Sequence, residues 1–195
     1  MKHLGRLKRL AAAGLVHVLT LAVAAPAIAA PLQALAQLDL GSYSGRWFQV
    51  ALYPNYFQRN CVSDTSANYR LLPEGAVEVV NQCRLADGSI DSIHGEARAT
   101  GRIDDQTVRP AQLEVSFLPR WLRWLPFGWG RYWVIRLADD GRYAVVSEPA
   151  REYLWVLSRE PRLSDDDESA IRSWLEEQGF DLARLQKHPH TAPAR

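Results

Sequence analysis

Cysteine, histidine and methionine are scarce in this chain of 195 residues, which contains two Cys, five His and one Met. Outside the apolar N-terminal segment the histidines are His94, His188 and His190. No group of His, Cys and carboxylate residues has the spacing of a metal site, and the sequence has no glycine-rich phosphate-binding loop. Ser147 has no base near it in the expected strand order, so a nucleophile–base pair is unsupported. We therefore expect no catalytic residue, no metal site and no cofactor.

An excess of charge is lacking as well, with 23 Lys and Arg residues against 22 Asp and Glu. The first residues differ, because basic residues without any acid precede an apolar run at 10–25 and small residues at 27–29. This pattern predicts a signal peptide over residues 1–29, with a retained N-terminal anchor as the alternative. Four of the basic residues and none of the acidic ones lie in that segment, so the remaining chain carries a formal charge of −3. Such a balance speaks against a nucleic-acid partner.

The two cysteines, Cys61 and Cys83, lie in the part of the chain that is expected to be exported. A pair of cysteines in an oxidising compartment favours a disulfide bond. The alternatives are two buried free thiols or a metal pair, and the lack of His partners weakens the second. No Cys directly follows the apolar N-terminal run, so an acceptor for lipid attachment is missing there.

From Gly45 to Arg159 the chain consists of short apolar segments separated at regular intervals by turn signals rich in Gly, Asp and Pro. This spacing predicts an all-β antiparallel barrel or sandwich, and eight strands suffice for a closed barrel around one small ligand. A single domain over residues 30–187 and a disordered tail over 188–195 are expected. The predicted strands are 46–53, 65–71, 76–84, 91–103, 111–118, 131–138, 142–148 and 153–158.

Alternation along the strands predicts which side chains face the barrel interior. In the fourth strand the inward set consists of small residues, which leave space that bulky side chains would fill. The alternative is that large residues from the opposite wall occupy that space. An apolar lining of this kind suits a lipid-sized ligand. The candidate ligand-binding residues are Ala67, Tyr69, Gly95, Ala97, Ala99, Leu113, Val115, Phe117, Trp133 and Ile135.

After the strands, one amphipathic helix is expected to pack against the outside of the barrel. Ser164 is a candidate N-cap, and Asp167 stands where a capping box has its acidic partner. Ile171 and Leu175 share one face at helical spacing, and Gly179 is placed to end the helix.

Three separated motifs resemble those of the lipocalin family. Gly45-Arg46-Trp47 matches its Gly-x-Trp motif, the acidic turn around Asp140 followed by Tyr143 is similar to its second motif, and Arg159 matches its third. Within the family the similarity is greatest to the bacterial lipocalins of the outer-membrane lipoprotein type and to apolipoprotein D. The resemblance implies an eight-stranded up-and-down antiparallel calyx with one C-terminal helix on the outside.

The resemblance also implies roles. Trp47 would plug the closed end of the barrel and Arg159 would stack on its indole, which makes both residues structural. The implied function is binding, storage or transport of a fatty acid or lysophospholipid in the barrel, in cell-envelope lipid maintenance. The implied location is the periplasm, with a possible association with the outer membrane. A lipocalin-fold enzyme acting on a lipid or isoprenoid substrate is the alternative.

The connection from Pro119 to Gly130 is rich in aromatic and basic residues, and strand parity places it at the open end. Such a mixture favours a bilayer interface. A lid that folds inward and a homodimer contact are the alternatives. The aromatic residues concerned are Trp121, Trp124, Phe127 and Trp129, accompanied by Arg120 and Arg123.

Overall fold

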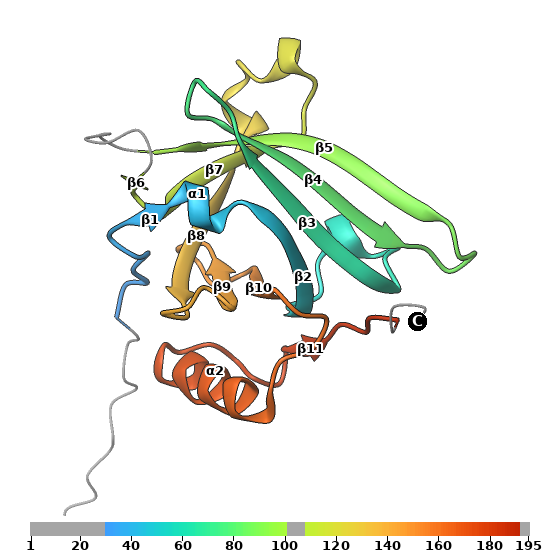
Figure 1. Ribbon diagram of the computed structural model, residues 1–195, viewed down its shortest axis with the longest axis vertical. Coiled ribbons are helices and arrows are strands. Elements are labelled where there is room, and N and C mark those ends of the chain that lie inside the picture. The colour runs from blue at the N-terminus through green and yellow to red at the C-terminus, as the bar shows by residue number, and fades with distance from the viewer. Residues whose placement is uncertain (1–29, 101–107, 192–195) are drawn as a thin grey trace, which may run out of the picture.

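A computed structural model describes residues 30–100 and 108–191 of the chain (Figure 1). The predicted signal peptide at 1–29 and the last predicted residues of the fourth strand, 101–103, lie outside the described residues. Within them, strands make up most of the regular structure. The barrel strands are β2 (Gly45–Leu52), β3 (Ser63–Leu71), β4 (Val77–Arg84), β5 (Ile90–Ala99), β7 (Gln112–Ser116), β8 (Gly130–Leu137), β9 (Tyr143–Ser147) and β10 (Leu154–Ser158).

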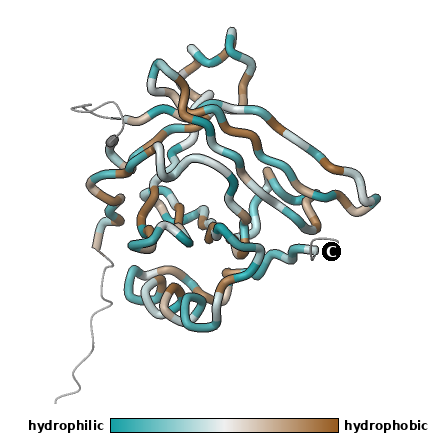
Figure 2. Tube along the Cα trace, in the orientation of Figure 1, coloured by the Kyte–Doolittle hydropathy of each residue, from teal (hydrophilic) through white to brown (hydrophobic). Residues whose placement is uncertain are grey.

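These eight strands form a closed antiparallel barrel, as predicted. Each pairs with the next along the chain, and β10 pairs with β2 to close the sheet. Hydrophobic and hydrophilic segments alternate along the strands (Figure 2). In such a meander alternate connections lie at the same end, so the β2–β3, β4–β5, β7–β8 and β9–β10 connections together surround one end of the barrel. We call this end the mouth.

Short elements flank the barrel. β1 (Leu38–Asp39) pairs with β6 (Val108–Arg109), and α1 (Leu40–Tyr43) follows β1. The Asp39 carboxylate caps α1 by accepting a hydrogen bond from the Gly41 N–H. The mouth connections carry three 3₁₀ turns, η1 (Tyr56–Gln58), η2 (Arg120–Leu122) and η3 (Pro126–Gly128).

The predicted helix is α2 (Asp165–Glu177), and it lies beside the barrel wall (Figure 1). The Ser164 side chain accepts a hydrogen bond from the Asp167 N–H at 3.1 Å, which confirms the predicted N-cap. Gly179 has a φ of 78°. The N–H groups of Gly179 and Phe180 then donate to the carbonyls of Glu176 and Leu175, as in a Schellman motif. No helix in the described part of the chain is both long and apolar enough to cross a membrane.

The sheet separates two apolar clusters. The first fills the barrel interior, where α1 and the inward faces of the strands meet. The second lies between the outer face of β2, β8, β9 and β10 and the helix, with Ile171, Leu175 and Phe180 supplied from α2 and the residues after it. The helix is therefore held by burial of its apolar face, as its spacing predicts.

Residues 188–191 differ from the expected disordered tail. After β11 (Gln186–Lys187), which pairs with β2, the His188 N–H donates to the Val50 carbonyl at 2.9 Å. His188 Nε2 lies 2.7 Å from Thr65 Oγ1, and the Thr191 N–H donates to Asp64 at 2.7 Å. The sequence gives no hydrophobic signal here, because the segment is held by polar contacts to strands far away in the chain.

Candidate functional site

The closed end of the barrel is built around Trp47, which is fully buried. Its indole N–H donates to the Tyr43 carbonyl at 2.8 Å, and the Arg159 guanidinium carbon lies 3.7 Å from its ring centroid. Gly45 makes this arrangement possible, since its φ is 92°, a backbone conformation that residues with a Cβ rarely adopt. The predicted structural roles of Trp47 and Arg159 agree with these contacts.

The second predicted motif attaches the helix rather than closing the barrel. Arg142 donates to Asp140 at 2.8 Å and makes two hydrogen bonds with Asp167 at the start of α2. These bonds lower the pKa of Asp167 below its ordinary value, against the effect of burial. Arg142 therefore attaches the turn between β8 and β9 to the first turn of α2 through Asp167. Tyr143 is buried in the cluster between the barrel and the helix.

The interior cluster contains most of the predicted ligand-binding residues. Their inward direction is confirmed, while their contact with a ligand stays a prediction. A Cβ on Gly95 would lie 2.6 Å from the Phe117 ring and 2.7 Å from the Ser116 carbonyl, so Phe117 fills the space beside this glycine. A large residue thus fills the space at that position, but it follows the adjacent strand β7 and does not come from the opposite wall, as the alternative had it. The predicted residues in or packed against this cluster are Ala67, Tyr69, Ala97, Ala99, Leu113, Val115 and Phe117.

The predicted inward direction of Trp133 and Ile135 is wrong. Both pack in the outer cluster against α2, whereas Val134 belongs to the interior cluster and Tyr132 packs against it. The register of β8 against β9 shifts between Val134 and Arg136. A bulge of this kind adds one residue and exchanges the faces on either side of it. Because Arg136 is charged, it was expected to face outward. Strict alternation along the strand then placed Trp133 and Ile135 on the inward face.

Three tyrosine hydroxyls meet inside the barrel, and of these three residues only Tyr69 was predicted to face inward. The Tyr132 hydroxyl lies 2.9 Å from that of Tyr43 and 2.9 Å from that of Tyr69. Burial raises the pKa of Tyr69 to about 12 and raises the pKa of Tyr43 and Tyr132 well above the ordinary value. The three groups therefore remain neutral hydroxyls that can donate and accept hydrogen bonds.

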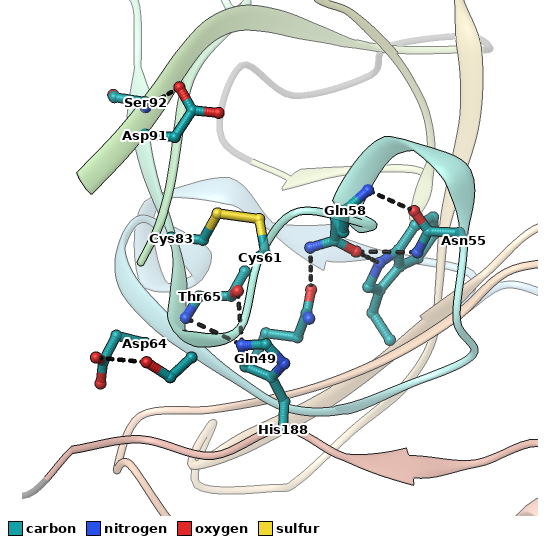
Figure 3. The surroundings of a disulfide bond; sticks show 12 residues. Gln49, Asn55, Gln58, Cys61, Asp64, Thr65, Cys83, Asp91, Ser92 and His188 are labelled. Atoms are coloured by element: carbon teal, nitrogen blue, oxygen red, sulfur yellow. Dashed lines mark hydrogen bonds between the residues drawn. A yellow bond between two sulfur atoms is a disulfide. The ribbon is translucent and has the colours of Figure 1, made fainter. Parts of the chain in front are cut away.

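A second polar group lies on the mouth side and comes from three separate segments (Figure 3). The Trp155 indole N–H donates to Gln58 Oε1 at 2.9 Å, and Gln58 Nε2 donates to Gln49 Oε1 at 2.7 Å. Asn55 Nδ2 also donates to Gln58 Oε1, at 3.0 Å. Gln58 thus ties the η1 turn to the walls formed by β2 and β10.

The predicted disulfide between Cys61 and Cys83 is confirmed, with Cα atoms 5.5 Å apart. It joins the β2–β3 connection to the end of β4 (Figure 3). Next to it, Arg84 donates to Asp64 at 2.8 Å. Although burial alone raises the pKa of Asp64, the hydrogen bonds from Arg84, Thr191 and Ser63 lower it far below its ordinary value. The disulfide bond and the ion pair between Arg84 and Asp64 together fix one side of the mouth.

The Trp-rich connection divides into an exposed part and an anchored part. Trp121, Trp124 and Phe127 are 73%, 76% and 79% exposed, which argues against an inward-folded lid. Trp129 instead donates its indole N–H to the Arg123 carbonyl at 2.7 Å, and the Arg98 guanidinium lies 3.9 Å from its ring. Arg123 forms an ion pair with Glu96, so it is engaged on the outer wall.

Exposed apolar side chains of the described residues gather toward the mouth. Besides the three aromatics of the β7–β8 connection, they belong to the β2–β3 connection and to the first half of β5, which are parts of the same end. Those further residues are Tyr56, Phe57, Val62, Ile90 and Ile93.

The fold and the site define the class of protein: a calyx, a barrel closed by a Trp–Arg plug and lined by apolar side chains. A family model described as a lipocalin-like domain matches residues 38–190. The chain therefore belongs to the lipocalin family, whose members bind small hydrophobic ligands and are generally binding or transport proteins.

The relatives and structures agree with this membership. The outer membrane lipoprotein Blc of Escherichia coli is 31% identical over 92% of this chain and 95% of its own length. Temperature-induced lipocalin-1 of Arabidopsis thaliana is 32% identical over 79% and 80%, respectively. Insecticyanin of the tobacco hornworm shares the fold with a TM-score of 0.63 at 16% identity, covering 87% of this chain and 90% of that one.

Proposed function

We propose that this protein binds a fatty acid or lysophospholipid inside the barrel and serves in cell-envelope lipid maintenance after export to the periplasm. The observation that carries the proposal is the interior cluster of apolar and aromatic side chains, which includes Trp47 at the closed end and has Phe117 packed against it. Burial of an acyl chain against such a surface contributes about 0.8 kcal/mol per CH₂ group. Similarity to outer membrane lipoproteins supports the envelope location.

Lipid exchange at a membrane surface is part of the proposal. The exposed aromatics surround the end of the barrel through which a lipid would enter, so the mouth can face a bilayer. An acyl chain that enters from the bilayer avoids transfer through water. A peripheral contact of this kind fits the Trp, Phe and Arg composition of the β7–β8 connection.

Titration with oleic acid and with oleoyl lysophosphatidylethanolamine tests the proposal through tryptophan fluorescence. Trp155 is the reporter, because it packs against the interior cluster on the mouth side, whereas Trp47 lies at the closed end and Trp133 faces the helix. We expect a saturable change in the wild type that is strongly reduced in Trp155→Phe and retained in the matched control Trp133→Phe. Native mass spectrometry then counts the bound lipid. A protein that takes up neither lipid by mass spectrometry would refute the proposal.

A further inference from the structure

The polar chain on the mouth side of the barrel has a fixed direction. An indole can only donate, so Trp155 fixes Gln58 Oε1 as the acceptor and leaves Gln58 Nε2 as the donor to Gln49 Oε1. The Nε2 group of Gln49 stands at the end of this chain. It is buried without a hydrogen-bond partner, and Gln49 as a residue is 4% exposed. This series of hydrogen bonds thus ends in an unused donor, Gln49 Nε2 (Figure 3).

A second unpartnered group lies two strands away. Asn81 Oδ1 is buried without a partner, and Asn81 pairs with Ala67 on β3 and with Ile93 on β5. Ala67 faces the interior and is also the ladder partner of Trp47, so Asn81 on β4 and Gln49 on β2 share the inward face of the sheet, with β3 between them. With about 5 Å between neighbouring strands, roughly 10 Å separates the backbones of β2 and β4.

Unpartnered polar atoms are rare in protein interiors, because each loses its hydrogen bonds to water without replacement. Two of them, one donor and one acceptor, therefore point to a partner that the described residues do not supply. Inside the barrel, the inward-facing positions of the described strands carry no charged side chain. The exception is Asp91, which lies at the mouth and is exposed. A buried anion would have no counter-charge there, so the partner must be neutral.

We propose that Gln49 and Asn81 form a subsite for a neutral hydroxyl group, with its neighbouring ester, in the linker of a monoacyl glycerolipid. Gln49 Nε2 donates to an oxygen of the linker, and the linker hydroxyl donates to Asn81 Oδ1. The acyl chain then extends into the apolar interior, and a charged headgroup, where there is one, remains at the mouth. This inference rests on the proposed lipid binding and favours glycerol-based lipids over free fatty acids.

Equilibrium binding of matched oleoyl lipids tests the subsite. The lipids are monooleoylglycerol, oleoyl lysophosphatidylethanolamine, counterparts of both in which hydrogen replaces the hydroxyl next to the ester-bearing carbon, and oleic acid. We expect the wild type to bind each hydroxylated lipid about tenfold more tightly than its counterpart, the scale of one or two net hydrogen bonds. Asn81→Leu and Gln49→Leu should reduce this preference to about twofold or less and leave oleic acid binding little changed.

The matched control is Gln82→Leu, which alters an exposed amide next to Asn81 on the same strand and should keep the preference. Asn81→Leu is the more secure variant, because Asn81 Oδ1 has no protein hydrogen bond to lose. If the wild type prefers only one of the two hydroxylated lipids over its deoxy counterpart, that lipid is the class that the subsite binds. Equal affinity of the wild type for hydroxylated and deoxy lipids, or a preference that survives both substitutions, overturns the subsite. Failure to bind any acyl lipid overturns the proposed function itself.

Discussion

Arg159 covers Trp47 from outside the closed end, with its guanidinium carbon 3.7 Å from the indole centroid. The same guanidinium donates to the Arg46, Ser42 and Ser44 carbonyls at distances from 2.8 to 3.0 Å. One side chain after the last barrel strand therefore holds α1, the first barrel strand and the plug together. This arrangement makes Arg159 a residue of stability.

Replacing Arg159 by Ala should lower the free energy of unfolding by roughly 1–3 kcal/mol, because stacking, three hydrogen bonds and packing are lost together. Urea unfolding measures the change. Arg162→Ala, at an exposed position in the loop that follows, is the control and should have little effect. A variant with full stability and abolished lipid binding would show that Arg159 contacts the ligand instead.

The bond between Cys61 and Cys83 spans 22 positions of the sequence. Removal of both thiols by Cys61→Ser and Cys83→Ser should lower the free energy of unfolding by about 3 kcal/mol, chiefly through the greater freedom of the unfolded chain. Peptide mapping without reduction should recover the two cysteines from exported protein as one linked species. Two free thiols in that protein would argue against the bond.

Replacing Trp121, Trp124 and Phe127 by Ser should abolish flotation with liposomes, because these three exposed side chains provide the apolar contact. Trp129→Ser is the control that leaves all three in place. Arg120→Ala should weaken the preference for anionic vesicles, whereas Arg123 contributes less because it already pairs with Glu96. Flotation of the triple variant at the wild-type level would rule out membrane docking by this connection. A change from dimer to monomer would instead identify a protein interface.

Acid should detach residues 188–191 from the barrel. The pKa of Asp64 is lowered in the folded protein, so its hydrogen bonds to Thr191 stabilise the segment above pH 4 or so and are lost below it. Burial and the neighbouring His190 lower the pKa of His188, so the detached segment binds a proton more readily once the pH falls below about 6.5. Both effects favour detachment at low pH.

Hydrogen exchange of the His188 and Thr191 amides measures this detachment after correction for the intrinsic rate. Protection should fall in two steps, the first as the pH falls below about 6.5 and the second only as it falls below about 4. His188→Gln should remove the first step and Asp64→Asn the second. Equal protection at pH 7 and at about pH 3 would contradict the assigned contacts.

Local patterns in the sequence determined much of this protein. Gly, Asp and Pro at regular spacing predicted the turns, alternation gave the inward face of β5 from Gly95 to Ala99, and Ser164 and Gly179 marked the ends of α2. Trp47 and Arg159 were found through their match to family motifs. Each of these features depends on residues that are neighbours in sequence or on a motif with its own signature, and such features can be predicted from a single sequence.

The tertiary structure decided what depends on register and on meetings between distant segments. The bulge after Val134 exchanged the faces of β8 and moved Trp133 and Ile135 to the helix side. Closure of the barrel brought together the hydroxyls of Tyr43, Tyr69 and Tyr132, and it joined Gln49, Gln58 and Trp155 in one chain of hydrogen bonds. None of these groups has a periodic signal, because each position is set by barrel curvature and strand register, which are properties of the closed sheet and of no single segment.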